Sequence, residues 1–276
     1  MSALICGSFA YDTIMVFQDQ FKNHILPDKV HILNVAFYVP EMRREFGGCA
    51  GNIAYNLKLL GGTPLPMGTV GSDFAPYAKW MDSHGIDRTH VTAIDDRYTA
   101  QAYITTDTDD NQITAFHPGA MDAAHENRVS DASGVSIGIV SPDGRQGMID
   151  HAAQFVAAGI PFIFDPGQGL PMFDGDDLKA FIDKASWVSV NDYELQLMQE
   201  RTGLSPHEIA GRVQALIVTR GGEGSHIYSG EQRIEIPVAP VEKLVDPTGC
   251  GDAYRGGLLF GLMNELDWET TGRIAA

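Results

Sequence analysis

The sequence predicts an α/β fold with a mostly parallel central sheet, helices on both of its faces, and a small β-rich appendage. Two observations indicate this class. Short apolar runs alternate with amphipathic helical patterns along most of the 276 residues, and two segments, 13–45 and 99–118, depart from that alternation. The runs that predict buried parallel strands are Ala3–Cys6, Val135–Val140, Pro161–Phe164, Trp187–Val190 and Leu216–Thr219.

The helical patterns have clear start and stop signals. Residues Asn52–Leu60 carry apolar side chains at helical spacing and end at two glycines, Gly61 and Gly62. Ser205-Pro206-His207-Glu208 is a capping box with proline at the first helical position. This alternation of strand and helix is what predicts helices on both faces of one sheet.

The two departing segments predict a β-rich flap that leaves the main sheet and returns. Residues 13–45 are irregular, aromatic and aliphatic, without a strong helix signal, whereas 99–118 predicts a hairpin of Thr99–Thr106 and Asn111–Pro118 around the polar turn Asp107–Asp110. The acidic turn superficially resembles a calcium loop. It lacks the glycine and the final carboxylate that such a loop needs, which favours a hairpin turn.

The composition excludes several classes of protein. No apolar run approaches the roughly 20 residues of a membrane span, and the N-terminus lacks the basic region of a signal peptide. The net charge of −17 argues against a nucleic-acid partner. Three widely spaced cysteines, Cys6, Cys49 and Cys250, form neither a disulfide framework nor a zinc motif, so we expect a cytoplasmic protein without a membrane partner.

The segment that most clearly indicates chemistry is Asp246-Pro247-Thr248-Gly249-Cys250-Gly251-Asp252-Ala253-Tyr254-Arg255-Gly256-Gly257. Its Gly-Cys-Gly turn before an apolar helix frees backbone N–H groups for an anion, which suits phosphoryl transfer. Asp252, on the first turn of that helix, is placed to accept a proton from an attacking hydroxyl. An isolated Gly-x-Gly-Asp would favour a simple helix start, but the whole string favours the catalytic interpretation.

Two further segments indicate a ligand site. Gly47-Gly48-Cys49-Ala50-Gly51-Asn52 places three glycines before a helix, lacks the spacing of the dinucleotide fingerprint, and offers an amide that can bond a sugar hydroxyl. Asp12 follows the first strand, and open α/β sheets bind ligands beyond the carboxyl ends of their strands. Asp12 is therefore a candidate for binding vicinal hydroxyls, with a plain turn residue as the alternative.

Together these segments resemble the ribokinase-like (PfkB) carbohydrate kinase family. Asn191-Asp192-Tyr193-Glu194 resembles the family's Asn-x-x-Glu motif, and Val218–Gly224 resembles its nucleotide-binding strand and turn. Within the family the likeness is to bacterial adenosine and nucleoside kinases, on the evidence of Phe116–Met121, Asp165–Gln168 and Arg255. The resemblance implies a ribokinase-like three-layer sandwich with a lid, in which 1–12, 46–98 and 119–276 form the core and 13–45 and 99–118 form the lid.

The resemblance also implies a role for each matching position. The nucleoside would be held at the ribose by Asp12, Gly48 and Asn52, and at the base by Ser8, Phe116 and Gln168. Asp252 would be the catalytic base, and the anion hole would be Gly249, Cys250 and Gly251. ATP would contact Asn191, Thr219, Gly221 and Gly224. Glu194 would bind Mg²⁺ through water, and Asp246 and Thr248 match positions that hold a monovalent cation such as K⁺.

The predicted activity is ATP-dependent phosphorylation of the 5′-hydroxyl of a purine nucleoside. Ala10 stands where sugar-specific relatives carry an Asn, and Gly169 and Ala102 stand where some adenosine-specific relatives carry a second Gln and an aromatic residue. The resemblance therefore implies a barer base pocket that would admit inosine or guanosine as well as adenosine. The alternatives are a PfkB-type kinase of ribose or fructose derivatives and a non-catalytic nucleoside sensor, which would not need Asp252. A homodimer through the lid is a candidate assembly.

The C-terminal pattern raises a question of length. A helix is expected from Asp252 to about Glu265, and Asp267 is placed to cap a further helical pattern over 268–276. The sequence ends at Ile274-Ala275-Ala276 within this helical pattern, and family relatives continue for a few tens of residues. We therefore expect this sequence to be a shortened form.

Overall fold

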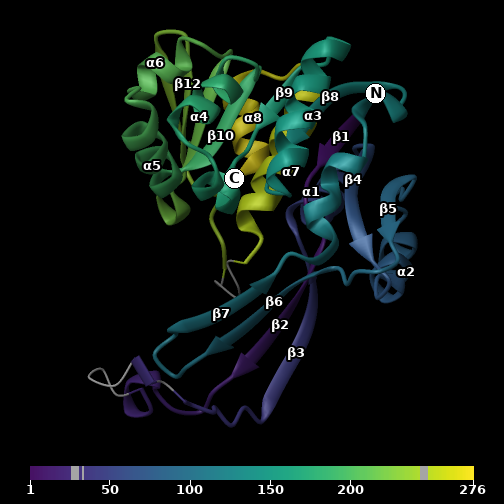
Figure 1. Ribbon diagram of the computed structural model, residues 1–276. Coiled ribbons are helices and arrows are strands. Elements are labelled where there is room, and N and C mark those ends of the chain that lie inside the picture. Colours follow the sequence, from purple (N-terminus) through teal and green to yellow (C-terminus); the bar gives the residue numbers. More distant parts are fainter. Residues whose placement is uncertain (26–30, 33, 243–247) are drawn as a thin grey trace.

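The described residues, 1–25, 31–32, 34–242 and 248–276, form two β-sheets in this computed structural model (Figure 1). The nine-stranded sheet has the order β13-β12-β11-β10-β9-β8-β1-β4-β5, and its pairs are parallel except those of β12. Its strands are β1 (Ser2–Cys6), β4 (Pro64–Gly71), β5 (His90–Ile94), β8 (Val135–Val140), β9 (Phe162–Phe164), β10 (Trp187–Asn191), β11 (Ala215–Thr219), β12 (Ser225–Ser229) and β13 (Gln232–Ile236). The five predicted strands are confirmed as β1, β8, β9, β10 and β11.

Helices cover both faces of this sheet, which confirms the predicted α/β class. One face packs against α1 (Cys49–Leu59), α2 (Ala75–Ser83), α7 (Cys250–Met263) and α8 (Trp268–Ala275). The other packs against α3 (Arg145–Ala158), α4 (Gly175–Ile182), α5 (Asp192–Thr202) and α6 (Pro206–Ala210). The short 3₁₀ segments are η1 (Phe21–Asn23), η3 (Gly119–Glu126), η4 (Val129–Asp131), η5 (Gly167–Met172) and η6 (Gly221–Glu223).

The two hydrophobic cores follow from the alternation of side chains along each strand. In β1, Ile5 packs into the core under α1 and α7, while its neighbour Leu4 packs into the core under α3. Ile139 and Val140 of β8 divide between the two cores in the same way. Because successive strand residues point to opposite faces, a continuous apolar run can serve both layers, and this explains why the buried strands could be predicted from their composition.

Most helix ends agree with the signals in the sequence. The Ser205 hydroxyl accepts a hydrogen bond from the backbone N–H of Glu208, so the predicted capping box is confirmed. Asp267 caps α8 by accepting a bond from the backbone N–H of Thr270 at 2.9 Å. The helix expected from Asn52 begins three residues earlier, at Cys49, because Gly48 makes the turn with φ of +89°.

The smaller sheet extends away from the nine-stranded sheet and has the order β3-β2-β6-β7 (Figure 1). Its strands are β2 (Ala10–Val16), β3 (Glu41–Gly47), β6 (Ala100–Thr106) and β7 (Gln112–His117). The predicted hairpin is the antiparallel pair β6–β7, and β2 runs parallel to β6. The expectation of an irregular segment over 13–45 was wrong where β2 and β3 lie. Strand β3 is mostly polar and exposed, and β2 is largely apolar but lacks a regular alternation of polar and apolar residues.

Interactions far from the core organise the outer end of this sheet. The rings of Phe17, Phe21 and Phe37 pack together with centroid separations of 4.8–5.8 Å. The carboxylate of Asp107 accepts bonds from the backbone N–H groups of Phe21 and Asn111 at 3.0 and 2.9 Å, which closes the β6–β7 turn. The acidic turn is thus a hairpin turn. Residues 26–30 and 33 of the predicted 13–45 segment lie outside the described residues.

Throughout the described ranges, no helix combines the length and apolar character that a membrane crossing requires.

Candidate active site

The strand order changes direction between β1 and β8. From β1 the chain continues to β4 and β5 on one side of the sheet, whereas β8 to β11 are added on the other side. Helix α7 packs on both β1 and β8. Ligands of open α/β sheets bind beyond the carboxyl ends of the strands at such a switch point, so this is where a site is expected.

The glycine-rich turn before α1 lies against the carboxyl end of β1. A Cβ atom on Gly48 would come within 2.6 Å of the backbone of Ser8 and Ala10, so only glycine fits there. The Ser8 hydroxyl accepts a hydrogen bond from the backbone N–H of Cys49 at 3.3 Å, and the Ser8 side chain is buried. Ser8, predicted for the base pocket, thus also supports the start of α1.

Asp252 lies in the first turn of α7 and meets Asn52 of α1. The Asn52 side-chain amide donates a hydrogen bond of 2.8 Å to Oδ2 of Asp252. Burial raises the pKa of Asp252 to about 6, and the negative charge of Asp165 raises it further. The hydrogen bonds from Asn52 and Cys49 and the positive charge of Arg255 lower this pKa, but they do not cancel the effect of burial. A carboxylate with such a pKa is ionised at neutral pH yet binds a proton more readily than an ordinary Asp, which suits a general base.

A cavity of about 500 Å³ lies between α1, α7 and the smaller sheet. This volume lies within the range of roughly 300–1,000 Å³ found for small-molecule sites. Its lining residues are Asp12, Ile14, Arg43, Glu45, Phe46, Asn52, Asn56, Thr248, Gly249, Cys250 and Ala253. The cavity therefore brings together two side chains predicted for the ribose and two residues predicted for the anion hole.

The smaller sheet places Asp12 and Phe116 on one face. Asp12 is paired with Glu45 on β3 and with Ala102 on β6, and Ala102 is paired with Phe116 on β7. Paired residues on neighbouring strands point to the same side, so these side chains form one row across the sheet. Burial, with the nearby charge of Glu45, raises the pKa of Asp12. Over the described residues, the cavity outline includes neither Phe116 nor Gln168, and both side chains are exposed.

The residues predicted for the anion hole form the N-terminal turn of α7. Gly249 is the N-cap with φ of +78°, and Cys250, whose side chain is exposed, begins the helix. Backbone N–H groups at this position lack helical partners and favour a negative charge. Thr248 lines the same cavity, whereas Asp246, the other residue predicted for a monovalent cation, lies outside the described residues.

The residues predicted for ATP lie farther along the same edge of the sheet. Asn191 ends β10 and is paired with Thr219, which ends β11. Gly221 and Gly224 follow with φ of +53° and +82°, and a Cβ atom on Gly224 would come within 2.1 Å of the carbonyl of Ile236. Their common position beyond two neighbouring strand ends fits a nucleotide site.

Glu194 fits a water-mediated role toward Mg²⁺ better than direct coordination. Its two carboxylate oxygens accept bonds from the backbone and side-chain nitrogens of Asn191 at 2.8 and 2.9 Å, which leaves further lone pairs free to accept bonds from water. Burial raises the pKa of Glu194. Among the described residues, no group of three or more His, Cys, Asp or Glu side chains is placed to hold a metal ion.

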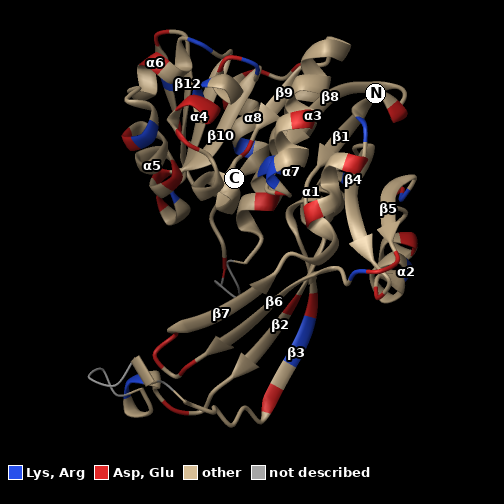
Figure 2. Ribbon diagram, in the orientation of Figure 1, with Lys and Arg blue, Asp and Glu red and all other residues tan. Residues whose placement is uncertain are grey.

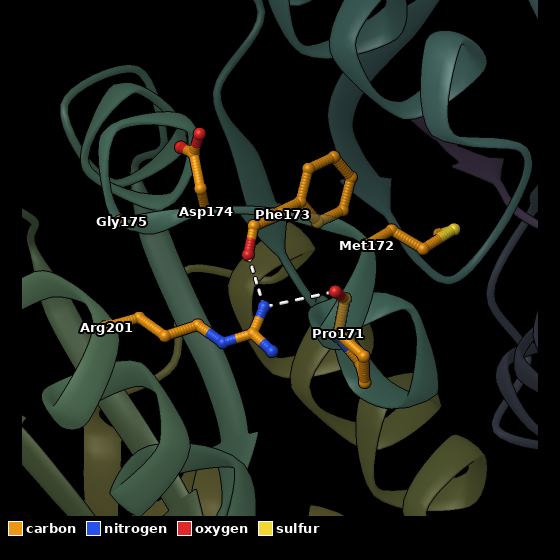
Figure 3. A pocket seen from close by; sticks show the side chains of 6 residues that line it. All are labelled: Pro171, Met172, Phe173, Asp174, Gly175 and Arg201. Atoms are coloured by element: carbon orange, nitrogen blue, oxygen red, sulfur yellow. Dashed lines mark hydrogen bonds between the residues drawn. The ribbon is translucent and has the colours of Figure 1, made fainter.

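A second cavity, of about 410 Å³, lies beside η5 and contains no predicted site residue (Figure 3). Its lining residues are Pro171, Met172, Phe173, Asp174, Gly175 and Arg201. Nη1 of Arg201 donates to the carbonyl oxygens of Leu170 and Pro171, both at 3.1 Å, and to that of Phe173. Arg201 thereby fastens the η5 segment that carries Gln168 to the last turn of α5.

Two basic residues were missed as site residues in the sequence. Arg255 was noted only as a family pointer, although a charged residue within the apolar run Ala253–Met263 is itself a signal; it is buried and paired with Asp165 at 2.8 Å. Arg43 lines the cavity from β3, where basic residues lie between acidic ends of the strand (Figure 2). Two adjacent basic residues, Arg43 and Arg44, are unusual in a chain of net charge −17, and this pair could have drawn attention to Arg43 as a site residue.

The fold and this site define a phosphotransferase that acts on a hydroxyl group. Residues 12–276 match the pfkB family of carbohydrate kinases. A nucleoside kinase of Methanocaldococcus jannaschii is 31% identical over 245 residues, covering 88% of this chain and 80% of that protein. The chain belongs to the pfkB family.

Solved structures are similar over nearly the whole chain. The nucleoside kinase of Burkholderia thailandensis in complex with inosine is 54% identical, with a TM-score of 0.90, and the match covers 99% of this chain and 88% of that one. The Methanocaldococcus jannaschii nucleoside kinase, described as an archaeal member of the ribokinase family, is 30% identical with a TM-score of 0.90, over 100% of this chain and 89% of that one. These matches confirm the ribokinase-like fold.

Proposed function

We propose that this chain transfers the γ-phosphoryl group of ATP to the ribose 5′-hydroxyl of a purine nucleoside, with Asp252 as the general base. The chain is a nucleoside kinase, like the two relatives above. The observation that carries the proposed mechanism is the 2.8 Å bond between Asn52 and Asp252, beside a cavity that Asp12, Asn52 and Gly249 line together.

In the proposed mechanism each group has one task. Asp12 and Asn52 hold the ribose hydroxyls, which directs the 5′-hydroxyl toward Asp252. Asp252 accepts the proton of that hydroxyl as it attacks. Backbone N–H groups at Gly249, Cys250 and Gly251 stabilise the negative charge that develops on the transferred group. Gly48 permits the close approach of the ribose to the backbone.

The phosphate donor is ATP, in keeping with the kinase family and with a Burkholderia thailandensis complex described as ADP-inosine. We place its contacts at Asn191, Thr219, Gly221 and Gly224. Mg²⁺, held through water by Glu194, would neutralise phosphate charge in the transition state. A K⁺ site at Asp246 and Thr248 stays a prediction.

A purine is the base that the site supports best. The Burkholderia thailandensis relative was solved with inosine. Phe116 presents an exposed aromatic ring on the same sheet face as Asp12, and such a ring can stack on a base. Ser8 and Gln168 are proposed to complete the base pocket when the smaller sheet, acting as the lid, closes over the cavity. The division of the chain into a core (1–12, 46–98, 119–276) and a lid (13–45, 99–118) is part of this proposal.

The assembly and location are also proposals. Exposed apolar side chains of Met42, Tyr103 and Ile113 lie on the lid face opposite to Asp12, and a second copy of the chain would cover them. Sedimentation as a monomer at every concentration tested would refute that dimer. Cys6, Cys49 and Cys250 are free thiols, which suits the reducing cytoplasm.

A substrate panel tests the proposed function. Purified protein is supplied with ATP and Mg²⁺ and with inosine, adenosine, guanosine, cytidine, 2′-deoxyadenosine, ribose or fructose, and the products are analysed by mass spectrometry and ³¹P NMR. We expect purine nucleoside 5′-monophosphates and weak activity on 2′-deoxyadenosine. The matched variant Asp252→Asn should lower kcat by about 10²–10⁴-fold. Preferential phosphorylation of ribose or of cytidine would overturn the substrate assignment.

A further inference from the structure

A buried ion pair joins the catalytic helix to the edge of the sheet. Nε and Nη2 of Arg255 donate to Oδ1 of Asp165 at 3.0 and 2.8 Å, and the two residues are only 5% and 3% exposed. Asp165 is itself held in place, because its backbone N–H donates to Val140 at 2.9 Å and its Oδ2 accepts a bond from Ser141 at 3.3 Å. Burying two charges is costly, so a pair this well bonded calls for a role.

The same arginine contacts the turn that carries the proposed chemistry. Its Nη1 donates to the carbonyl oxygen of Gly251 at 3.3 Å, within the proposed anion hole. Arg255 lies three residues after Asp252, so the two side chains are neighbours on one side of α7. Asn52 holds Asp252 from α1, and Asp165 holds Arg255 from the loop after β9. Two separate elements therefore fix the orientation of this first turn.

We propose that Asp165 and Arg255 are a positioning pair for phosphoryl transfer: the pair orients the first turn of α7 and balances the charge beside Asp252. The proposal rests on the proposed role of Asp252 as the base. Neither residue touches the reacting atoms. Each acts through Asp252 and through the backbone of the anion hole.

The charges around Asp252 make the proposal testable. The titratable groups that face it are Cys49 from α1, Tyr77 from α2, Asp165 from the loop after β9, and Arg255 from α7 itself. Glu194 of α5 faces Arg255. Asp165 raises and Arg255 lowers the pKa of Asp252, so the two partners oppose one another. Neutralising either one leaves the other unopposed.

The test is the pH dependence of kcat at saturating substrates for Asp165→Asn, Arg255→Gln and the double variant. We expect the acidic limb to move to lower pH in Asp165→Asn and to higher pH in Arg255→Gln, each by about one pH unit. The double variant should return the limb to the wild-type position, with kcat still reduced roughly tenfold because the turn is less well oriented. Shifts in the same direction, or no shift, would overturn the proposal.

Controls separate this result from general effects of charge and folding. Asp183→Asn and Arg212→Gln remove an exposed pair of 3.0 Å. These residues precede β10 and β11, at the opposite edge of the sheet, and should leave the limb in place. Arg255→Lys keeps the positive charge but loses the paired hydrogen bonds to Asp165. For this variant we expect an unchanged acidic limb and a lower kcat, whereas a wild-type kcat would refute the positioning role. If Arg255→Gln does not fold, the Arg255→Lys and Asp165→Asn variants still test the proposal. Full turnover of Asp252→Asn would refute the proposed base instead.

Discussion

At the scale of single residues, burial sets the chemistry of the carboxylates around the cavity. Asp252, Asp12 and Glu194 all have raised pKa values, and burial is the largest cause for each. Hydrogen bonds from Asn52 and Asn191 oppose that effect at Asp252 and Glu194 without cancelling it. Limited contact with water therefore makes the carboxylate of Asp252, the proposed base, bind a proton more readily than an exposed Asp.

The pKa of Asp252 predicts the acidic limb of the pH profile. Because a protonated carboxyl cannot accept the substrate proton, kcat/KM for the nucleoside should fall below about pH 6, the pKa of Asp252. The measurement is kcat/KM from pH 4.5 to pH 8 at saturating ATP, with binding of ATP followed separately as a control. A flat profile across pH 6 would show that another group, or no group, is the base.

Asp143 predicts a dependence of stability on pH that is unrelated to catalysis. Burial raises its pKa to about 8, and its Oδ2 has no hydrogen-bond partner among the described residues. A carboxyl with a raised folded-state pKa stabilises the fold most below the unfolded pKa, about 3.9, and that contribution is lost as the pH rises toward 8. Asp143→Asn, which keeps the acceptor for Gly144, should therefore stabilise the protein more at pH 8 than at pH 5.

Urea unfolding at the two pH values measures this difference. Asp183→Asn is the control, because the carboxylate of Asp183 is exposed and paired with Arg212. An equal change in the free energy of unfolding at pH 5 and pH 8 for Asp143→Asn would contradict the raised pKa.

At the scale of elements, close packing of two helices brings the site together. A Cβ atom on Gly256 would meet Asn56 and the backbone of Leu57 at 3.0–3.1 Å, so α7 approaches α1 closely only because this position is glycine. That approach lets Asn52 reach Asp252. The glycines of the final segment thus have two tasks: some form the anion hole, and others set the distance between the helices.

The η5 segment predicts a role for Arg201 in nucleoside binding. Arg201→Gln should release three carbonyl groups of the segment that carries Gln168, so KM for the nucleoside should rise several-fold while KM for ATP changes little. Steady-state kinetics with each substrate varied in turn provides the measurement. Arg212→Gln, a change on the exposed surface, is the matched control. Equal increases in both KM values would indicate a general structural effect instead.

At the scale of the whole molecule, the cavity lies between two bodies with very different packing. The nine-stranded sheet is covered on both faces, whereas most side chains of β3 and β7 are exposed. Asp12 and Phe116 belong to the exposed sheet, while Asn52 and Asp252 lie on α1 and α7, which pack against the nine-stranded sheet. The proposed lid role is that the smaller sheet approaches the larger one when the nucleoside binds, which would bring Phe116 to the base and exclude water from the transferred group.

This arrangement predicts that the nucleoside protects the smaller sheet. Backbone amides of β2, β6 and β7 should exchange hydrogen more slowly with nucleoside bound, because closure buries the face that carries Asp12 and Phe116. Hydrogen exchange followed by mass spectrometry tests this, with Asp12→Ala as the control that should bind nucleoside weakly and show less protection. Unchanged exchange in these strands at saturating nucleoside would refute closure.

Much of this protein follows from the sequence alone, because the relevant signals are local. Apolar runs predict buried strands, and capping residues predict where helices start. Glycines before a helix that begins beside Asp252 indicate the proposed anion hole. These patterns were enough to predict the α/β class, the pfkB family, the hairpin of 99–118 and the proposed base. Strands β2 and β3 were not predicted, because β3 is mostly polar and exposed, and β2 shows no regular alternation of polar and apolar residues.

Only the tertiary structure decided which distant residues meet. Asn52 and Asp252 are 200 positions apart, Arg255 and Asp165 are 90 apart, and no local pattern relates either pair. The row from Asp12 through Ala102 to Phe116 likewise depends on the parallel pairing of β2 with β6 and on its register. Local sequence determines which elements form, whereas register and helix packing, which depend on the whole core, determine which side chains share a site.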